Sequence, residues 1–140
     1  MRVTLAALAD YANVTMEGKL NIMGIFQEIN APTLPFQLAQ MYLVVSFSAA
    51  PSEAPAQKRL EVKLLAADGA QVFAAQQILP VQPPNRPGAR LITNAVMGIG
   101  GLLFNGAGDY AFSILVDGDE KESVPLRVNP PGGPALPPAH

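Results

Sequence analysis

The feature of this sequence that most constrains its fold is a regular alternation of side chains near the end of the chain. The even-numbered residues from Tyr110 to Val116 are all large and apolar, and so are those from Val124 to Val128. Successive side chains of a β-strand point to opposite faces, so this pattern predicts two strands that bury the same face. The intervening Asp-Gly dipeptide is typical of a hairpin turn. We therefore expect Gly106 to Val128 to form the closing hairpin of a β-sandwich.

The turn of this hairpin is constrained by the register of its strands. A two-residue loop at Asp117-Gly118 would place the inward-facing Ile114 opposite the outward-facing Lys121. A one-residue slip of this kind is strongly disfavoured when one face is buried. We therefore predict an odd-length loop, or a β-bulge, between Asp117 and Lys121. A three-residue loop would set Ile114 opposite Val124.

Tyr110 has two interpretations. It follows a tight bend that begins at Gly106. In immunoglobulin-like sandwiches a tyrosine in such a place bonds its hydroxyl to the backbone a few residues upstream, an arrangement called the tyrosine corner. The alternative is an ordinary aromatic side chain of the core.

The rest of the chain contains further short apolar segments separated by glycine and proline, and no long stretch with apolar residues at helical spacing. We predict an all-β fold, a two-sheet antiparallel β-sandwich of the immunoglobulin-like or a related Greek-key kind, with about eight strands. Two segments are apolar on both faces, which predicts central strands: Leu20 to Ile29 and Met41 to Ser48. The remaining predicted strands are Arg2 to Ala9, Lys58 to Ala66, Gln71 to Ile78, Leu91 to Met97 and Leu102 to Phe104.

Turn-favouring residues connect these strands. Asp10 to Asn13 is predicted to bend away from the first strand, and Gly24 to mark a bulge or a close backbone approach. Asp68-Gly69 is the strongest hairpin signal and fits a two-residue loop. The prolines of Pro80 to Pro87 predict a stiff loop that crosses between the sheets. Bending of the chain is predicted at a group of glycines: Gly98, Gly100 and Gly101.

The domain organisation follows from length and composition. Residues 1–128 are predicted to form a single domain, and the Pro/Gly-rich residues 129–140 a disordered tail. No apolar run approaches the roughly 20 residues of a transmembrane helix. The start of the chain imitates a signal peptide, but its apolar run is short, so we expect a first strand there instead. The predicted location is cytoplasmic, with secretion left open.

Several segments resemble a family of small stand-alone bacterial proteins of unknown function. The resemblance extends over residues 1–128 and rests on strand and turn motifs. It implies a free-standing bacterial β-sandwich, and it supplies no catalytic residues. The segments that carry it are LADYANV (8–14), GKLNIMGIF (18–26), MYLVVSF (41–47), GDYAFSILVDG (108–118) and SVPLRV (123–128).

Groups that carry enzyme chemistry are scarce. The single histidine is His140 in the predicted tail, and there is no cysteine, which argues against a histidine-based triad, a thiolate nucleophile and a zinc site. The acidic group Asp117 to Glu122 could hold Ca²⁺, but a solvated turn is the simpler interpretation. We predict that the protein is not an enzyme and binds no cofactor or metal.

Charged residues make up 14% of the chain, against roughly 25% in typical domains, and the net charge is −2. These values predict no nucleic-acid partner and no membrane, and a homo-oligomer, most simply a dimer, with an unidentified protein partner as a further option. The predicted function is a non-enzymatic protein-interaction or assembly module that self-associates. The alternative is a module that binds a small ligand, such as a carbohydrate, through loops at one end of the sandwich. The candidate interaction surface comprises Tyr11, Phe36, Met41 and Tyr42.

Overall fold

The structure is a computed structural model that describes residues 1–83 and 86–132. Within these ranges the chain forms nine strands and one turn of 3-10 helix, η1 (Pro51–Glu53). No helix in the described ranges is long and apolar enough to cross a membrane. Most of the predicted tail, residues 133–140 with His140, lies outside the described residues. The strands are β1 (Arg2–Val14), β2 (Leu20–Phe26), β3 (Glu28–Asn30), β4 (Phe36–Ala49), β5 (Ala56–Leu65), β6 (Gln71–Val81), β7 (Leu91–Phe104), β8 (Gly108–Val116) and β9 (Asp119–Asn129).

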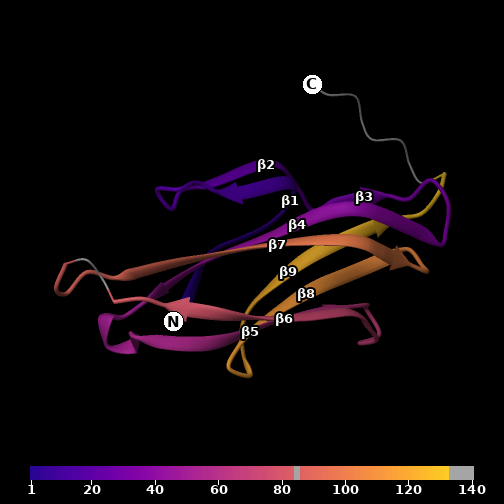
Figure 1. The fold of residues 1–140 in the computed structure, drawn as a ribbon. Helices are drawn as coiled ribbons and strands as arrows, with labels where there is room; N and C mark the ends of the chain where they lie inside the picture. The colour runs from indigo at the N-terminus through magenta and orange to yellow at the C-terminus, as the bar shows by residue number, and fades with distance from the viewer. Residues whose placement is uncertain (84–85, 133–140) are drawn as a thin grey trace.

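The strands form two sheets that pack face to face, which confirms the predicted all-β sandwich (Figure 1). One sheet has the order β2-β1-β4-β7 and the other the order β3-β9-β8-β5-β6. Neighbouring strands are antiparallel except β3 and β9, which are parallel. Both sheets contribute fully buried side chains to the core between them, among them Phe47, Phe104, Phe112 and Leu126.

Strand β4 is covered on both faces, as predicted for Met41 to Ser48. It lies between β1 and β7, and its side chains at odd positions from Met41 to Phe47 belong to the core. The alternate side chains point to the outer face of the sheet. Three of these, Val44, Ser46 and Ser48, are also buried. Something must therefore lie over the outer face of this sheet.

The β1–β2 hairpin folds back over this outer face (Figure 1). β1 pairs with β4 only as far as Ala9, and from Leu8 onward it pairs with β2. A straight continuation would carry the hairpin along β4 toward Phe36. Its tip instead reaches β7, where the Asn94 side-chain amide donates a hydrogen bond to the Gly18 carbonyl at 3.2 Å. The prediction of a bend after Ala9 is therefore correct, but residues 10–13 remain in a strand, because β2 supplies their backbone partners.

Gly24 lies at the bend. The β1–β2 ladder omits the pair Asp10 and Gly24, and Gly24 has a φ of +71°. The Asp10 side chain occupies the space that a Cβ on Gly24 would need. A positive φ and the lack of a side chain are both properties of glycine, so this residue allows both strands to bend at one point. The close approach at Gly24 is therefore made by the Asp10 side chain, and not by backbone as the sequence had indicated.

The prediction of one central strand from Leu20 to Ile29 is wrong. β2 is an edge strand of the first sheet and ends at Phe26, and β3 then joins the second sheet beside β9. On β2, Met23 and Ile25 are 64% and 56% exposed. An apolar run indicates contact on both faces, but here the chain changes sheets within it and leaves part of it uncovered.

The glycines of β7 lie inside one strand rather than between two. β7 pairs with β4 without a register shift from Leu91 to Phe104. Bending does occur, since the ladder omits Gly101, whose φ is +71°. The buried side chains lie at odd positions up to Ile99 and at even positions from Leu102 onward. The predicted bend is thus present without a break in the ladder.

The closing hairpin has the predicted bulge. Val116 pairs with Asp119, so Asp117 and Gly118 form a two-residue turn with φ values of +50° and +88°. A register shift follows between Ile114 and Leu115, and it returns the apolar side chains to the core face. The predicted three-residue loop is not formed.

The earlier hairpin turn differs from the prediction. Ala66 donates a backbone hydrogen bond to Ala70, and Gly69 donates one to Ala66, so the loop contains three residues. A register shift between Leu64 and Leu65 compensates for the extra residue. The plain two-residue loop was therefore wrong, although the predicted pairing of Leu64 with Phe73 is correct.

Tyr110 forms the predicted tyrosine corner. Its hydroxyl donates a hydrogen bond to the Gly106 carbonyl at 2.6 Å. Its ring is buried and packs edge-on against Phe104 with centroids 5.1 Å apart. The side chain therefore fixes the β7–β8 connection and also joins the core.

We expect Tyr110→Phe to lower the free energy of unfolding by about 1–2 kcal/mol, because the variant keeps the ring but leaves the Gly106 carbonyl without its donor. Urea denaturation followed by circular dichroism measures this change. Tyr11→Phe is the control, since the Tyr11 hydroxyl is exposed and only accepts a 3.4 Å bond from Asn13. Equal stabilities of the two variants would contradict the role of the corner.

We expect Gly24→Ala to lower the free energy of unfolding by about 1–3 kcal/mol, because alanine at a positive φ is strained and its Cβ must displace Asp10. Gly69→Ala is the control, since Gly69 has a φ of +88° and no atom lies within 4 Å of its added Cβ. The loss in Gly24→Ala should exceed the loss in the control. A smaller loss would show that the hairpin bends without depending on Gly24.

Candidate functional site

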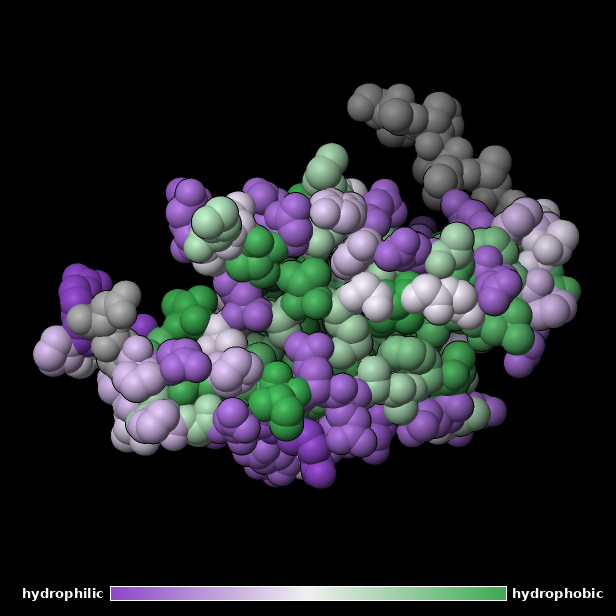
Figure 2. Space-filling view, viewed as in Figure 1, coloured by the Kyte–Doolittle hydropathy of each residue, from purple (hydrophilic) through white to green (hydrophobic). Residues whose placement is uncertain are grey.

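The main candidate site is a pocket of about 580 Å³ at one end of the sandwich. Its walls come from the tip of the β1–β2 hairpin, the end of β6, the β6–β7 connection and the start of β7. In Figure 2 the outline of the molecule is notched between the hairpin tip and this connection, and hydrophobic side chains lie in the notch. The fold-back of the hairpin therefore creates the pocket, because it brings Gly18 over Ile92 to Asn94.

Arg86 and Arg90 are the charged residues among the described lining. The Arg90 Nε atom donates a hydrogen bond at 2.7 Å to the hydroxyl oxygen of Ser48, which is buried on the outer face of β4. This bond orients the guanidinium plane and leaves its two terminal nitrogens free for other acceptors. Within the described ranges, no carboxylate lies within 4.0 Å of either arginine.

The surroundings of these arginines are poor in negative charge. The sequence has no Asp or Glu between Asp68 and Asp109, a stretch that includes β6 and β7. Glu53 lies in η1, and its carboxylate is bonded to the Met1 ammonium at 2.8 Å and to the Ala50 amide at 2.7 Å. These hydrogen bonds, the ammonium first, lower the pKa of Glu53 to about 2.

The hairpin tip brings one further carboxylate near the pocket. Glu17 precedes the lining residue Gly18, and its carboxylate accepts a 3.4 Å bond from the Thr15 hydroxyl. Lys19 directly follows Gly18, and its positive charge offsets the charge of Glu17. The balance of charge at this end is therefore positive, although the chain as a whole carries −2.

Asn94 closes the inner edge of the pocket. Its amide nitrogen bonds to Gly18, while its Oδ1 is buried and has no donor among the described residues. A buried acceptor without a partner costs free energy. The contact between the hairpin tip and β7 is therefore polar and incompletely satisfied, in contrast to the dry core below it.

The predicted interaction residues Tyr11 and Tyr42 lie together on the outer face. Their rings meet edge to face with centroids 5.2 Å apart. The Tyr42 hydroxyl accepts a 3.0 Å bond from Gln40, and the Tyr42 ring lies 3.2 Å from where a Cβ on Gly98 would be. The pair thus fastens the folded hairpin to β4, just beyond the bend.

The other two predicted residues do not join this pair. Met41 is fully buried in the core, and Phe36 is half-buried against it at the start of β4. Neither contributes a free aromatic or apolar side chain beside Tyr11. None of the four predicted residues is among the described lining of the pocket.

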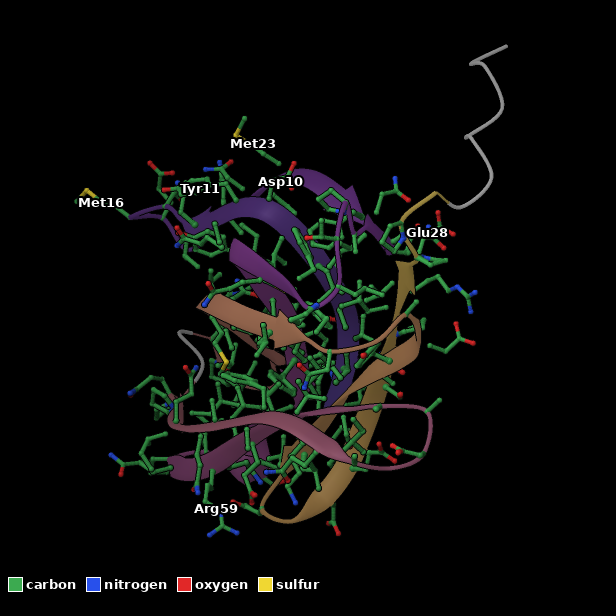
Figure 3. All side chains as sticks on the ribbon, turned by 90° about the vertical axis from the view of Figure 1, so that its right-hand side faces the viewer. Asp10, Tyr11, Met16, Met23, Glu28 and Arg59 are labelled. Atoms are coloured by element: carbon green, nitrogen blue, oxygen red, sulfur yellow. The ribbon has the colours of Figure 1, made fainter. Side chains whose placement is uncertain are left out.

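The hairpin itself exposes several large apolar side chains. In Figure 3, Met16 lies at its tip and Met23 points away from the body of the molecule. Tyr11 pairs with Met23 beyond the bend, and Ala9 pairs with Ile25 before it. The exposed apolar residues of the hairpin are Tyr11, Val14, Met16, Met23 and Ile25.

Two acidic side chains of the turn after β8 accept hydrogen bonds from within the protein. Asp117 accepts a 2.8 Å bond from the backbone amide of Arg59, and Glu120 accepts a 2.6 Å bond from the Ser113 hydroxyl. Within residues 1–83 and 86–132, no group of three or more acidic, histidine or cysteine side chains could hold a metal ion. Asp117 and Glu120 therefore have structural partners of their own.

Sequence reasoning missed the pocket. Its residues come from two separate segments, the hairpin tip and the stretch from Pro80 to Asn94, and the fold-back of the hairpin brings them together. One signal was present: Arg86 and Arg90 are the charged residues in a long stretch without any Asp or Glu. That signal predicts a positive end but not a cavity.

Comparison with known proteins identifies the family. A family model described as a family of unknown function, DUF6941, matches residues 4–129. The chain belongs to this family. The predicted resemblance to a family of unknown function is thereby confirmed. No curated protein sequence matches the chain.

Among solved structures, the chain is similar to the Pseudomonas fluorescens alkylpurine DNA glycosylase AlkC bound to DNA containing an abasic-site analogue. The identity is 13%, the TM-score is 0.42, and the match covers 89% of this chain and 30% of the glycosylase chain. This match contradicts the predicted partner set, which excluded nucleic acid, and we withdraw that exclusion. The exclusion of nucleic acid was based on the net charge. Net charge describes the whole chain and gives no information about a local pair of arginines such as Arg86 and Arg90. A likeness this distant carries no argument for DNA binding by this chain.

Proposed function

We propose that the protein is a non-enzymatic module that binds a small ligand in the pocket between the β1–β2 hairpin tip and the β6–β7 connection. The observation that carries this proposal is a pocket of about 580 Å³ lined by both polar and apolar side chains. Binding sites for small molecules in proteins have volumes of about 300–1,000 Å³. The alternative function predicted from sequence, a ligand site in loops at one end of the sandwich, is therefore the one that the geometry supports best.

The composition of the lining supports binding rather than catalysis. The described lining residues include no histidine, cysteine or carboxylate, which are the usual general acids, bases and nucleophiles. They also include no aromatic ring on which a sugar could stack, so the carbohydrate proposed from sequence is not singled out. The cytoplasmic location remains a prediction from sequence.

The proposal is tested with a library of small fragments and two-dimensional ¹H–¹⁵N NMR. We expect fragments that bind to shift the backbone amides of Gly18, Thr93 and Asn94, and to raise the melting temperature, because a ligand that binds the native state stabilises it.

Two tryptophan variants serve as matched tests. Ile92→Trp places a large side chain at the pocket mouth and should abolish fragment binding, since Ile92 lines the pocket and is 63% exposed. Ile78→Trp should leave binding unchanged, since Ile78 is similarly exposed at 58% and is not among the described lining residues. Fragments whose shifts map elsewhere, or which bind Ile92→Trp normally, would contradict the proposal.

A second candidate function is the protein-interaction module predicted from sequence. It is favoured by the exposed apolar side chains of the hairpin, among them Tyr11, Met23 and Ile25. Exposed apolar side chains gathered on one face often mark a protein-interaction site.

Methionine oxidation tests this candidate. In the purified protein we expect peroxide to oxidise Met16 and Met23 early and Met41 last, because exposure controls access. If a partner covers this face in cells that make the protein, Met23 should oxidise at least about threefold more slowly there, relative to the fully exposed Met16, than in the purified protein. An unchanged ratio of the two rates, read by mass spectrometry, would argue against a covered face.

A further inference from the structure

We propose that the ligand of this pocket is a small organic molecule that carries an oxyanion, a carboxylate or a phosphate, bound by Arg86 and Arg90. This inference rests on the proposed function, since it names the class of ligand for the same pocket. Three observations carry it: the state of the two arginines, the charge around them and the nature of the remaining wall.

The first observation is that neither guanidinium group has an anionic partner among the described residues. Two of the other three arginines have one, Arg59 with Glu61 and Arg127 with Asp109, each at 3.0 Å, while Arg2 has none in the described ranges. In the described ranges no carboxylate lies within 4.0 Å of Arg86 or Arg90. Guanidinium groups bind carboxylate and phosphate oxygens through paired hydrogen bonds, so two unpaired arginines on one pocket wall form a site for such a group.

The second observation is that Arg90 is held in place before any ligand arrives. Its Nε donates to the buried Ser48 hydroxyl at 2.7 Å, which leaves the terminal nitrogens to bind elsewhere. An arginine positioned in this way loses less side-chain entropy on binding. Ser48 is therefore a positioning residue for Arg90.

The third observation is the contrast between the charged and apolar parts of the wall. Val14, Leu91 and Ile92, with Pro80 and Pro83, line the pocket together with the arginines and provide its apolar surface. Inorganic phosphate alone would leave this surface unused. A ligand with both an oxyanion and an apolar body matches both parts.

The experiment measures the affinities of three probes by isothermal titration with the full chain. Benzoate and phenyl phosphate carry the oxyanion on an apolar ring, and benzamide is the neutral counterpart of benzoate. We expect at least one of the two anions to bind about tenfold or more tightly than benzamide, since hydrogen bonds between charged groups are roughly twice as strong as neutral ones. The comparison between benzoate and phenyl phosphate distinguishes the two kinds of oxyanion.

Four variants locate the effect. Arg86→Gln and Arg90→Gln should each weaken binding of the preferred anion by about tenfold and leave benzamide unchanged. Arg59→Gln is the matched control, since Arg59 is exposed and lies away from the hairpin (Figure 3). Ser48→Ala should weaken anion binding less than Arg90→Gln does, because it keeps both guanidinium groups and removes only the bond that positions Arg90. Anion binding should also weaken as salt increases.

The outcomes separate the two proposals. If benzamide and benzoate bind equally in the pocket and the Arg86 and Arg90 variants have no effect, the oxyanion inference fails while the ligand-binding function stands. If none of the probes binds, and the fragment library yields no ligand that Ile92→Trp excludes, both fail. A loss of anion binding in Arg59→Gln of the same size as in Arg90→Gln would also overturn the inference, because it would show a non-specific effect of net charge.

Discussion

The bend at Asp10 and Gly24 is the constraint on which the functional part of this structure depends. Both strands of the β1–β2 hairpin turn at this point, where Gly24 has a positive φ and the Asp10 side chain fills the space of its missing Cβ. Because the hairpin folds back, it covers the outer face of β4 and fastens there through Tyr11 and Tyr42. The fold-back of the hairpin also forms the pocket beside Asn94 and leaves Met23 and Ile25 exposed. The candidate ligand site and the candidate protein-binding face therefore arise from a single bend.

Much of the fold could be predicted from the sequence because strand alternation is a local property. The alternation from Tyr110 to Val128 placed each core residue of the closing hairpin correctly, and register alone required either an odd-length loop or a bulge near Asp117, of which the structure has the bulge. Prediction failed where the position of a strand depends on neighbours that are distant in the sequence. The run from Leu20 to Ile29 looks central, but the chain leaves one sheet and enters the other at Gln27, and no local pattern shows which sheet a strand joins.

The site was less predictable than the fold for the same reason. Gly18 is far from Arg86 and Asn94 in the sequence, and each has an ordinary local setting. Net charge was also misleading, since −2 describes the whole chain while the stretch from Gly69 to Gly108 contains arginines and no carboxylate. Four residues were predicted to form an interaction surface. Of these, Met41 and Phe36 contribute to the core, and Tyr11 and Tyr42 contact each other.

The bend and the arginines are linked through β4. Ser48 is on the outer face of this strand, which would be an ordinary solvated face if the hairpin extended straight along β4. The Ser48 hydroxyl is buried and must find a partner, and Arg90 provides it. This bond fixes the orientation of a guanidinium group at the pocket whose other wall is the hairpin tip. A change that loosens the bend should accordingly affect the site as well as stability, even though Gly24 contacts neither arginine.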